Sequence, residues 1–462
     1  MEEGIMRKSI TRLTAMILSG FVLINSVFGF TLTVKAKDTK STSTQTSTNN
    51  AYTSELLAEK YTYISAEYTG DPYTGKQIEI PINKAFETGT GTIIDAVDIE
   101  ASYQYKNPVI KMDIGQKGTL TFNVDKTAIY YISFDYLSSD NAILPIEMSM
   151  KVNGEYPFYE ARRLMFESQW LSAKHKTYDR YGNQVVSVPE KRMEWNNKYV
   201  MDASYRYAMP LGIQLQAGRN TIEIDMTEGN VLLGNMYLNK GIDIEEYTEP
   251  KKAEGGEIYT LQGEYPTYRN DSSIRALCEY DVDITPYNVK KKELNTLDGQ
   301  SFKDAGQTVT YEQNIEKAGY YYIALNYKQS DKSDFPVFVD VKVDGIIPNT
   351  QLKDYPLSYG KSYNTITLQD DDSNYISVYL GEGKHTISFT ISIDPIRHVM
   401  ESVESIMSEI NNLSLEITKV AGTNKDKYRD VNMEVYIPGV GQKLYDYADE
   451  LEALVDSVKS YN

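Results

Sequence analysis

The chain has 462 residues, enough for two to four domains, and its formal net charge is −18. Nucleic-acid binding needs a basic surface, so this charge argues against that class of partner. The sequence contains no G-x-S-x-G, H-E-x-x-H, C-x-x-C or phosphate-loop motif, so we expect no enzyme and no bound cofactor. A pair of catalytic carboxylates stays open as an alternative, because such pairs are recognised by their separation in space.

The first 36 residues are typical of a secretory signal. Basic residues precede an uncharged run over 15–34, and Ala36 ends a V-K-A motif that suits signal peptidase. If it stays uncut, this run is long enough to anchor the chain in a membrane. Positive charge on its N-terminal side places the rest of the chain outside the cytoplasm. We therefore expect a secreted or cell-surface protein with a Ser/Thr-rich linker over 37–58, touching the membrane only through the leader.

A long internal duplication organises the middle of the chain. Residues 118–154 match residues 309–345 at a constant offset of 191. Within these blocks, large alternating residues coincide: Tyr130, Ile132, Phe134 and Tyr136 with Tyr321, Ile323, Leu325 and Tyr327. A slip of one residue would turn the buried face of a strand to water, so the shared register indicates two copies of one domain. Gly218 matches Gly383 at an offset of 165, so the first copy carries 26 extra residues between the matched blocks.

Both copies consist of short alternating segments separated by turn residues. This pattern favours two antiparallel β-sandwiches, the first over 60–245 and the second over 257–397. A hydrophilic linker over 246–256 is expected between them. Tyrosine is abundant, with 39 residues, and it suits strands that are buried on one side and wet at the ring tip.

The extra length of the first copy lies in an aromatic insertion over 155–210. It carries both tryptophans of the chain and many side chains that can hydrogen-bond sugar hydroxyls. Aromatic rings stack on sugars, while carboxylate, amide and guanidinium groups bind the hydroxyls. The candidate ligand-binding residues are Trp170, Trp195, Tyr178, Arg180, Asn183 and Glu190. The alternative is that the tryptophans close the open end of the sandwich or dock the second domain.

Two acidic features could serve a calcium ion. Glu67 and Glu264 occupy matching early positions in the two copies, where an acidic residue can help a metal or ligand site. A solvated glutamate at a sheet edge is the commoner explanation. The acidic run over 370–372 lacks the spacing and the turn glycine of an EF-hand, so a solvated turn is favoured there.

After Pro395 the apolar period changes from that of a strand to that of a helix. The apolar positions are Val399, Met400, Val403, Ile406, Met407 and Ile410. The pattern ends near Gly422, and a second amphipathic helix is expected from about residue 440. Neither helix can bury its apolar stripe alone, so we expect a helical pair over 398–462.

Three segments resemble large Gram-positive extracellular solute-binding proteins of carbohydrate ABC importers. They are VAGTNKDKYRD over 420–430 with the Y-I-P that follows, DRYGN over 179–183, and Pro189-Glu190 with Trp195. In that family, two galactose-binding-like sandwiches precede a bilobed solute-binding body, and the resemblance covers most of 60–460. The chain stops where that body would begin, and the leader lacks the lipid-attachment cysteine. The resemblance therefore implies two galactose-binding-like sandwiches in the accessory half of such a receptor.

The leading hypothesis is a non-catalytic extracytoplasmic protein that binds a glycan or oligosaccharide and supports sugar uptake. Its expected partners are ABC importer components or a bilobed solute-binding body. The alternative is a structural spacer or docking protein whose C-terminal helices bind a partner. A third hypothesis is a glycan-active enzyme, which would need two facing carboxylates.

Overall fold

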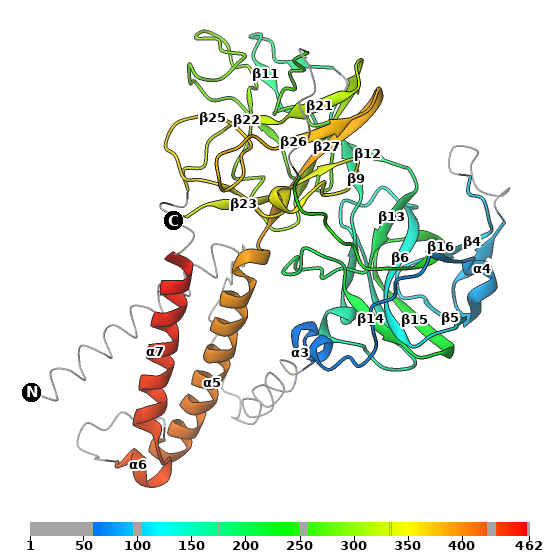
Figure 1. Ribbon diagram of the computed structural model, residues 1–462, viewed down its shortest axis with the longest axis vertical. Coiled ribbons are helices and arrows are strands. Elements are labelled where there is room, and N and C mark those ends of the chain that lie inside the picture. The colour runs from blue at the N-terminus through cyan, green and yellow to red at the C-terminus, as the bar shows by residue number, and fades with distance from the viewer. Residues whose placement is uncertain are drawn as a thin grey trace, which may run out of the picture. The chain divides into compact units, whose positions relative to one another are not determined.

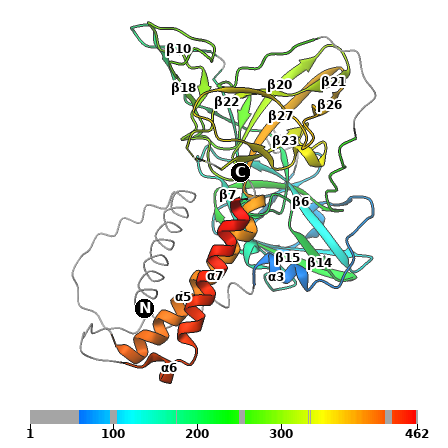
Figure 2. The same ribbon diagram turned by 60° about the vertical axis from the view of Figure 1, so that its left-hand side comes forward.

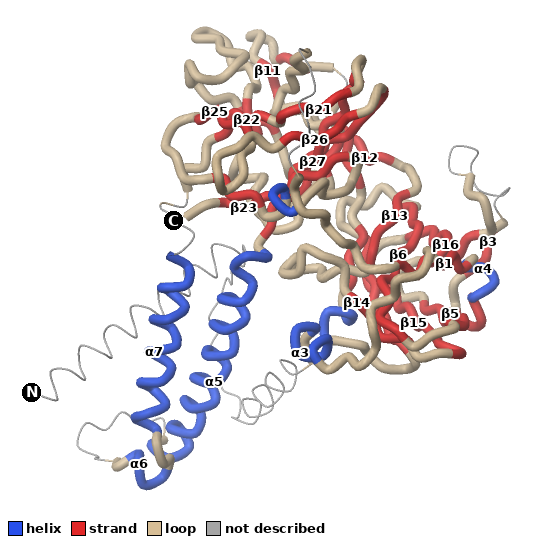
Figure 3. The backbone as a smooth tube through the Cα atoms, in the orientation of Figure 1, coloured by secondary structure: helices blue, strands red, loops and turns tan. Residues whose placement is uncertain are grey.

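The computed structural model describes residues 59–95, 104–173, 175–248, 257–331, 333, 335–422 and 431–459. The expected leader, the whole Ser/Thr-rich linker over 37–58 and most of the linker over 246–256 lie outside the described residues. The chain divides into two compact units, one from Ala58 to Arg397 and one that contains the C-terminal helices. Strands dominate the first unit and helices the second, which confirms the predicted fold class of antiparallel sheets followed by helices (Figures 1 and 3).

The first sandwich contains a five-stranded and a seven-stranded sheet. The five strands follow the order β2-β5-β15-β7-β8. The seven-stranded sheet runs β13-β6-β16-β4-β3, with β1 paired to β16 and β14 paired to β6. The strands are β1 (Ile78–Ile80), β2 (Phe86–Gly89), β3 (Thr92–Ile94), β4 (Val109–Met112), β5 (Lys117–Val124), β6 (Ala128–Ser138), β7 (Ile146–Val152), β8 (Leu164–Phe166), β13 (Asn196–Tyr199), β14 (Gly212–Leu215), β15 (Gly218–Glu228) and β16 (Val231–Asn239). Short helices α3 (Tyr61–Ala66), α4 (Ile82–Ala85) and η3 (Tyr159–Arg162) accompany them.

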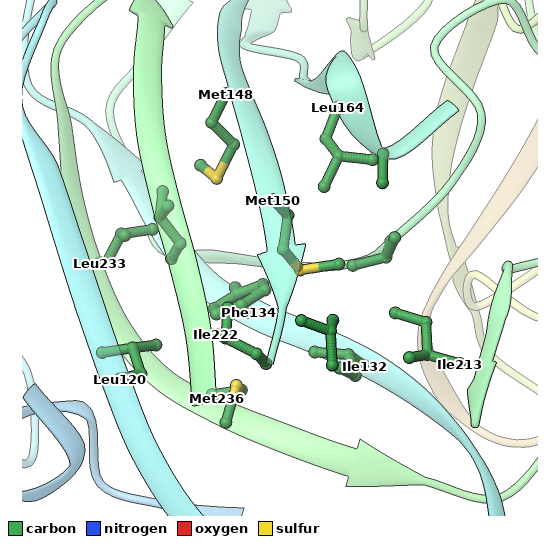
Figure 4. Packing of buried hydrophobic residues seen from close by; sticks show 14 of the residues in the cluster. Leu120, Ile132, Phe134, Met148, Met150, Leu164, Ile213, Ile222, Leu233 and Met236 are labelled. Carbon is green, nitrogen blue, oxygen red and sulfur yellow. The ribbon is translucent and has the colours of Figure 1, made fainter. Parts of the chain in front are cut away.

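The core of the first sandwich lies between these two sheets (Figure 4). Ile132 and Phe134 of β6 are fully buried, as their alternation predicts. They belong to one cluster with Leu120 of β5 and Ile222 of β15, which come from the other sheet. The buried face of β6 therefore includes the residues that the period-two pattern marks.

The second sandwich is built around another seven-stranded sheet, of order β12-β9-β17-β20-β27-β23-β24. Three two-stranded sheets, β18-β19, β21-β26 and β22-β25, complete it. Its own strands are β17 (Tyr268–Arg269), β18 (Ala276–Leu277), β19 (Thr296–Leu297), β20 (Thr308–Ile315), β21 (Gly319–Tyr322), β22 (Ala324–Tyr327), β23 (Val337–Val343), β24 (Tyr355–Leu357), β25 (Asn364–Thr367), β26 (Ser377–Leu380) and β27 (Gly383–Ser392). The short helices η4 (Thr350–Leu352) and η5 (Asp394–Ile396) belong to this half. Val341, Leu352 and Leu368 are fully buried at its centre.

One block of strands has the same order in both sandwiches. The order β5-β15-β7-β8 of the first sandwich corresponds to β20-β27-β23-β24 of the second. Strands β5, β7 and β8 begin 191 residues before β20, β23 and β24, and β15 begins 165 residues before β27. These are the same two offsets at which the sequence segments match.

The C-terminal unit is a helical hairpin of α5 (Arg397–Ala421), the short α6 (Met433–Tyr436) and α7 (Val440–Lys459). Gly422 follows α5 with a φ of 74°, a left-handed conformation that glycine adopts readily at a helix end. Helices α5 and α7 lie side by side in both views (Figures 1 and 2). They share a buried cluster of Ile406, Leu413, Ile437, Val440 and Tyr447. The predicted helical pair is thus confirmed, and no helix in the described part of the chain is long and apolar enough to span a membrane.

Candidate functional site

The aromatic insertion builds the junction between the two sandwiches. Its strands β9 (Gln169–Leu171) and β12 (Glu190–Arg192) pair with each other. Strand β9 also pairs with β17, so the insertion adds two strands to the sheet of the second sandwich. The insertion therefore docks the second domain, which is the structural role that the sequence left open.

A second contact comes from the hairpin of β10 (Thr177–Tyr178) and β11 (Gln184–Val185). The side-chain oxygen of Gln184 accepts a hydrogen bond from the backbone N–H of Leu294 at 3.1 Å. The amide of Gln184 donates to the hydroxyl of Tyr265, and its backbone N–H donates to the carbonyl of Lys292 at 2.8 Å. Because Gln184 is buried, these bonds hold the hairpin firmly to the second sandwich.

A cavity of about 410 Å³ lies at this junction, where β9 ends. The insertion contributes Leu171, Ser172, Ala173, Lys176 and Glu190 to its wall, and the second sandwich contributes Tyr265, Pro266 and Thr267. Its volume falls within the usual range of small-molecule sites, about 300–1,000 Å³. The site therefore exists only because the two sandwiches meet.

The wall of the cavity combines an aromatic ring with charged and hydroxyl groups. The ammonium of Lys176 lies 5.1 Å from the ring centre of Tyr265, within reach of a cation–π contact. The hydroxyl of Ser172 donates to the carbonyl of Pro266 at 2.6 Å and accepts from Arg269 at 3.3 Å. Glu190 is exposed, so its carboxylate is open to a ligand.

Two buried charged side chains accompany the cavity. Glu264 precedes Tyr265 and is only 3% exposed, and burial raises the pKa of its carboxyl, with its own backbone N–H and Lys176 acting in the opposite direction. Arg269, the partner of Ser172, is also buried. The Oε1 atom of Glu264 and the Nε atom of Arg269 have no hydrogen-bond partner. Buried polar atoms without partners are rare in folded proteins, and these two belong to residues beside the cavity wall rather than to the wall itself.

Lys191 lies at the middle of the same strand pair, opposite Trp170. Its ammonium donates to the hydroxyl of Ser138 at 2.7 Å and to the carbonyls of Asp140 and Ala142 at 2.9 Å. It also lies 5.9 Å from the ring centre of Trp170. Burial lowers the pKa of Lys191, and the nearby Asp140 carboxylate opposes this effect. These contacts attach the insertion to the first sandwich.

The six candidate ligand residues do not form one platform. Glu190 lines the cavity. Trp170 is only 6% exposed, and its ring lies against the ammonium of Lys191. Trp195 packs against a separate buried cluster of the first sandwich, where its ring centre lies 4.4 Å from that of Tyr105.

The other three candidates belong to the β10–β11 hairpin. Tyr178 is exposed. The guanidinium of Arg180 stacks on Tyr181, with its central carbon 4.6 Å from the ring centre. The side chain of Asn183 donates to Asp179 at 3.0 Å and accepts from the backbone N–H of Lys292 at 3.1 Å. Asn183 and its neighbours therefore build the hairpin and its contact with the second sandwich.

The cavity residues Lys176, Ser172, Tyr265 and Thr267 were not among the candidates. Tyr265 follows Glu264, which the sequence did single out, but nothing local connects this position with the insertion. The pairing of β9 with β17 brings the two segments together, and strands of three and two residues carry too little periodicity to predict such a pairing.

The weak metal candidates have different surroundings. Glu67 is exposed beside α3, whereas Glu264 is buried. The carboxylate of Asp370 accepts hydrogen bonds from the backbone N–H groups of Asp372 and Asn374, so it closes a turn. Over the described residues, no group of three or more His, Cys, Asp or Glu side chains could hold a metal ion.

Several solved structures resemble part of the chain. The GH26-CBM35 β-(1,4)-mannanase of Podospora anserina is 14% identical over 37% of this chain and 30% of its own, with a TM-score of 0.24. The catalytic unit of the GH87 α-1,3-glucanase of Streptomyces thermodiastaticus is 16% identical over 38% and 28%, also with a TM-score of 0.24. The chain thus spans less than a third of either enzyme. The C-terminal CBM6 of the laminarinase LamC of Zobellia galactanivorans is 9% identical over 36% of this chain and 100% of its own, with a TM-score of 0.22. At such scores the likeness carries no argument about this chain.

No curated protein sequence matches the chain. A family model does match its C-terminal part: residues 398–462 are similar to the 4-helix bundle domain of bacterial solute-binding proteins. This match covers the helical hairpin of α5, α6 and α7 and none of the two sandwiches.

Proposed function

We propose that the chain is a non-catalytic glycan-binding protein that works outside the cytoplasm in support of sugar uptake. The observation that carries this proposal is the cavity where the two sandwiches meet. Its wall supplies the ring of Tyr265 for stacking, the carboxylate of Glu190 and the ammonium of Lys176. A sugar presents C–H faces to rings and hydroxyls to charged groups, so this combination suits a mono- or oligosaccharide.

The charged side chains of the cavity wall support a polyhydroxylated ligand rather than an apolar one. An apolar molecule would leave Glu190 and Lys176 desolvated without partners, which costs free energy. Hydroxyl groups can both donate to Glu190 and accept from Lys176. The ligand expected in the cavity is therefore small, polar and uncharged or zwitterionic.

A non-catalytic role fits the distribution of carboxylates. Most glycosidases use two carboxylates that flank the bond to be cleaved, about 5–10 Å apart. Among the residues that line the cavity, Glu190 alone carries a carboxylate. We therefore assign binding rather than hydrolysis to this site.

The C-terminal hairpin supports a connection to sugar import. Its match to a domain of bacterial solute-binding proteins is the reason to propose a bilobed solute-binding body or ABC importer components as partners. The leader over 1–36 supports an extracytoplasmic location. Glu67 and Glu264 are the candidate ligands for calcium, so binding is measured with and without this ion.

The proposal is tested by screening the secreted chain on a glycan array with and without calcium, followed by calorimetry on the best oligosaccharide. Tyr265→Ala and Glu190→Gln should each weaken binding roughly tenfold or more, because they remove the stacking ring and the carboxylate. The control Glu223→Gln changes an exposed glutamate on β15 and should bind like the wild type. Folded wild-type protein that binds no glycan under either condition would refute the proposal.

The pairing of β9 with β17 favours a second function, that of a spacer between the membrane and a partner. A continuous sheet across the junction would hold the two sandwiches in one arrangement. A spacer would retain its partner when Tyr265 and Glu190 are changed. It would lose the partner when the sheet is disrupted at Trp170.

A further inference from the structure

Four tyrosines gather on one exposed face of the second sandwich, which we name the tyrosine face. Tyr320 and Tyr322 lie on β21, Tyr379 lies on β26, and Tyr375 lies just before β26. Their exposed fractions are 42%, 61%, 61% and 52%. Large aromatic side chains with this much exposure at neighbouring positions mark an interaction site more often than a bare surface.

The register of the strands places these rings together. Tyr320 lies directly opposite Tyr379 in the β21–β26 pair. The ring centres of Tyr320 and Tyr379 are 5.4 Å apart, and those of Tyr322 and Tyr375 are 5.6 Å apart. Both pairs meet edge to face, with interplanar angles of 66° and 60°, which restrains the orientation of the rings. The intervening residues, such as Val378, are buried in the core on the other side.

The same face continues along β22 and β25 without charge. Ala324 lies opposite Thr367, and Asn326 lies opposite Thr365. From Tyr320 to Asn326 the face is about 20 Å long, given about 3.3 Å for each residue of a strand. It is thus an elongated surface of aromatic rings, hydroxyls and one amide.

The first sandwich covers the matching side of its sheet with its own side chains. There, Leu137 of β6 is buried under Tyr105 and Trp195. Asp135 of β6 accepts a hydrogen bond from the hydroxyl of Tyr237 at 2.8 Å. Strand β16 also runs along β6, whereas β21 and β22 pair only with β26 and β25 in the described residues. Exposure of this face is therefore a property of the second sandwich alone.

We propose that the tyrosine face binds an extended, neutral polysaccharide. This inference rests on the proposed glycan-binding function and adds a second site with its own ligand class. Rings with hydroxyl tips match the alternating C–H faces and hydroxyls of a sugar chain, and the length of the face suits several sugar units in a row. The face carries no cation, and the chain has a net charge of −18, so an anionic polymer would be repelled.

The experiment is affinity electrophoresis of the full chain in gels that contain laminarin, mannan, xylan or hydroxyethyl cellulose. The wild type should be retarded by at least one of these polymers. The variant Tyr322→Ala/Tyr379→Ala should bind that polymer roughly tenfold more weakly, because it removes one ring from each pair. Tyr322→Phe/Tyr379→Phe keeps the rings and should retain most of the binding. Tyr63→Ala removes a tyrosine of similar exposure on α3 of the first sandwich and should change nothing.

Variants of the junction cavity and of the tyrosine face test the two proposed sites separately. Tyr265→Ala should lose the short oligosaccharide of the junction cavity and keep the polymer. If the tyrosine-face variant, shown to be folded by circular dichroism, binds the polymer like the wild type, the inference is wrong and the proposed function stands. If the wild type binds no glycan of any length, both are wrong. If the variant instead changes the sedimentation coefficient, the face is a contact between copies of the chain and the inference is wrong.

Discussion

Asp340 is a buried carboxyl group that makes the stability of the second sandwich depend on pH. It lies on β23, is 2% exposed, and accepts a hydrogen bond from the backbone N–H of Asp354 at 2.9 Å. Burial raises the pKa of its carboxyl, and the hydrogen bond from Asp354 offsets only part of this effect. The folded state therefore keeps the proton of Asp340 to a higher pH than the unfolded state does.

The first prediction concerns Asp340→Asn, which keeps an acceptor for Asp354 and removes the buried charge. Since the folded state binds more protons, the contribution of Asp340 to stability falls as pH rises from its ordinary pKa of about 3.9 through the raised value. The variant should be more stable than the wild type at neutral pH, by about 1.4 kcal/mol for each unit of pKa elevation. The advantage should vanish in acid below the ordinary value. Urea unfolding at a series of pH values measures this.

The control for this prediction is Asp371→Asn, which changes an exposed aspartate in the turn before β26. It should leave the free energy of unfolding unchanged at every pH. A loss of stability in Asp340→Asn at neutral pH would show that the ionised carboxylate is needed for the fold.

At the scale of elements, the insertion matters through the two strands that it adds to the second sandwich. Trp170 lies at their centre, opposite Arg269 on one side and Lys191 on the other. Because Trp170 is buried there, its side chain stabilises the junction through packing.

The second prediction follows for Trp170→Ala. The substitution should cost about 3–5 kcal/mol of unfolding free energy, as for other large buried aromatic residues. Hydrogen exchange should become faster first in β9 and β17, where the cavity left by the ring weakens the strand pairing. Tyr181→Ala, an exposed aromatic on the same insertion, should change stability by less than about 0.5 kcal/mol. Equal effects of the two substitutions would contradict this role of Trp170.

The regular strands were predictable because their period is local. The alternation over Tyr130 to Tyr136 identifies the buried face of β6, and the constant offsets locate the corresponding strands of the second sandwich. The junction was not predictable in the same way. Strands β9 and β12 have three residues each, and β9 finds its partner β17 in the other sandwich. Of the residues that line the cavity, only Glu190 was therefore predicted from the sequence, and no sequence pattern connects the other lining residues with each other.

At the scale of the whole molecule, the chain consists of two compact units of different secondary structure. The helical unit has its own buried cluster around Leu413 and Tyr447. The change of period after Pro395 and the glycine at 422 were sufficient to predict α5, and the apolar pattern from about residue 440 predicted α7, whereas the short α6 was not predicted. The exposure of the tyrosine face was not predictable, since it depends on which strands are present beside β21 and β22.

The third prediction is that the two units unfold separately. Leu413→Ala should cost the helical unit about 2–5 kcal/mol and lower its thermal transition, while the transition of the sandwich unit stays in place. Ile222→Ala, in the core of the first sandwich, should have the opposite selectivity. Differential scanning calorimetry of the full chain measures both transitions. A single transition that moves equally in both variants would show that the units unfold cooperatively.

The walls of the junction cavity come from both sandwiches, and this has a mechanical consequence. A molecule held there touches both bodies at once, so it must leave before they can be pulled apart. Occupancy at a hundredfold excess over the dissociation constant would add about 2.7 kcal/mol to the work of separating them. A chain with a bound ligand would therefore keep its two sandwiches together at pulling forces that separate them in a chain without ligand.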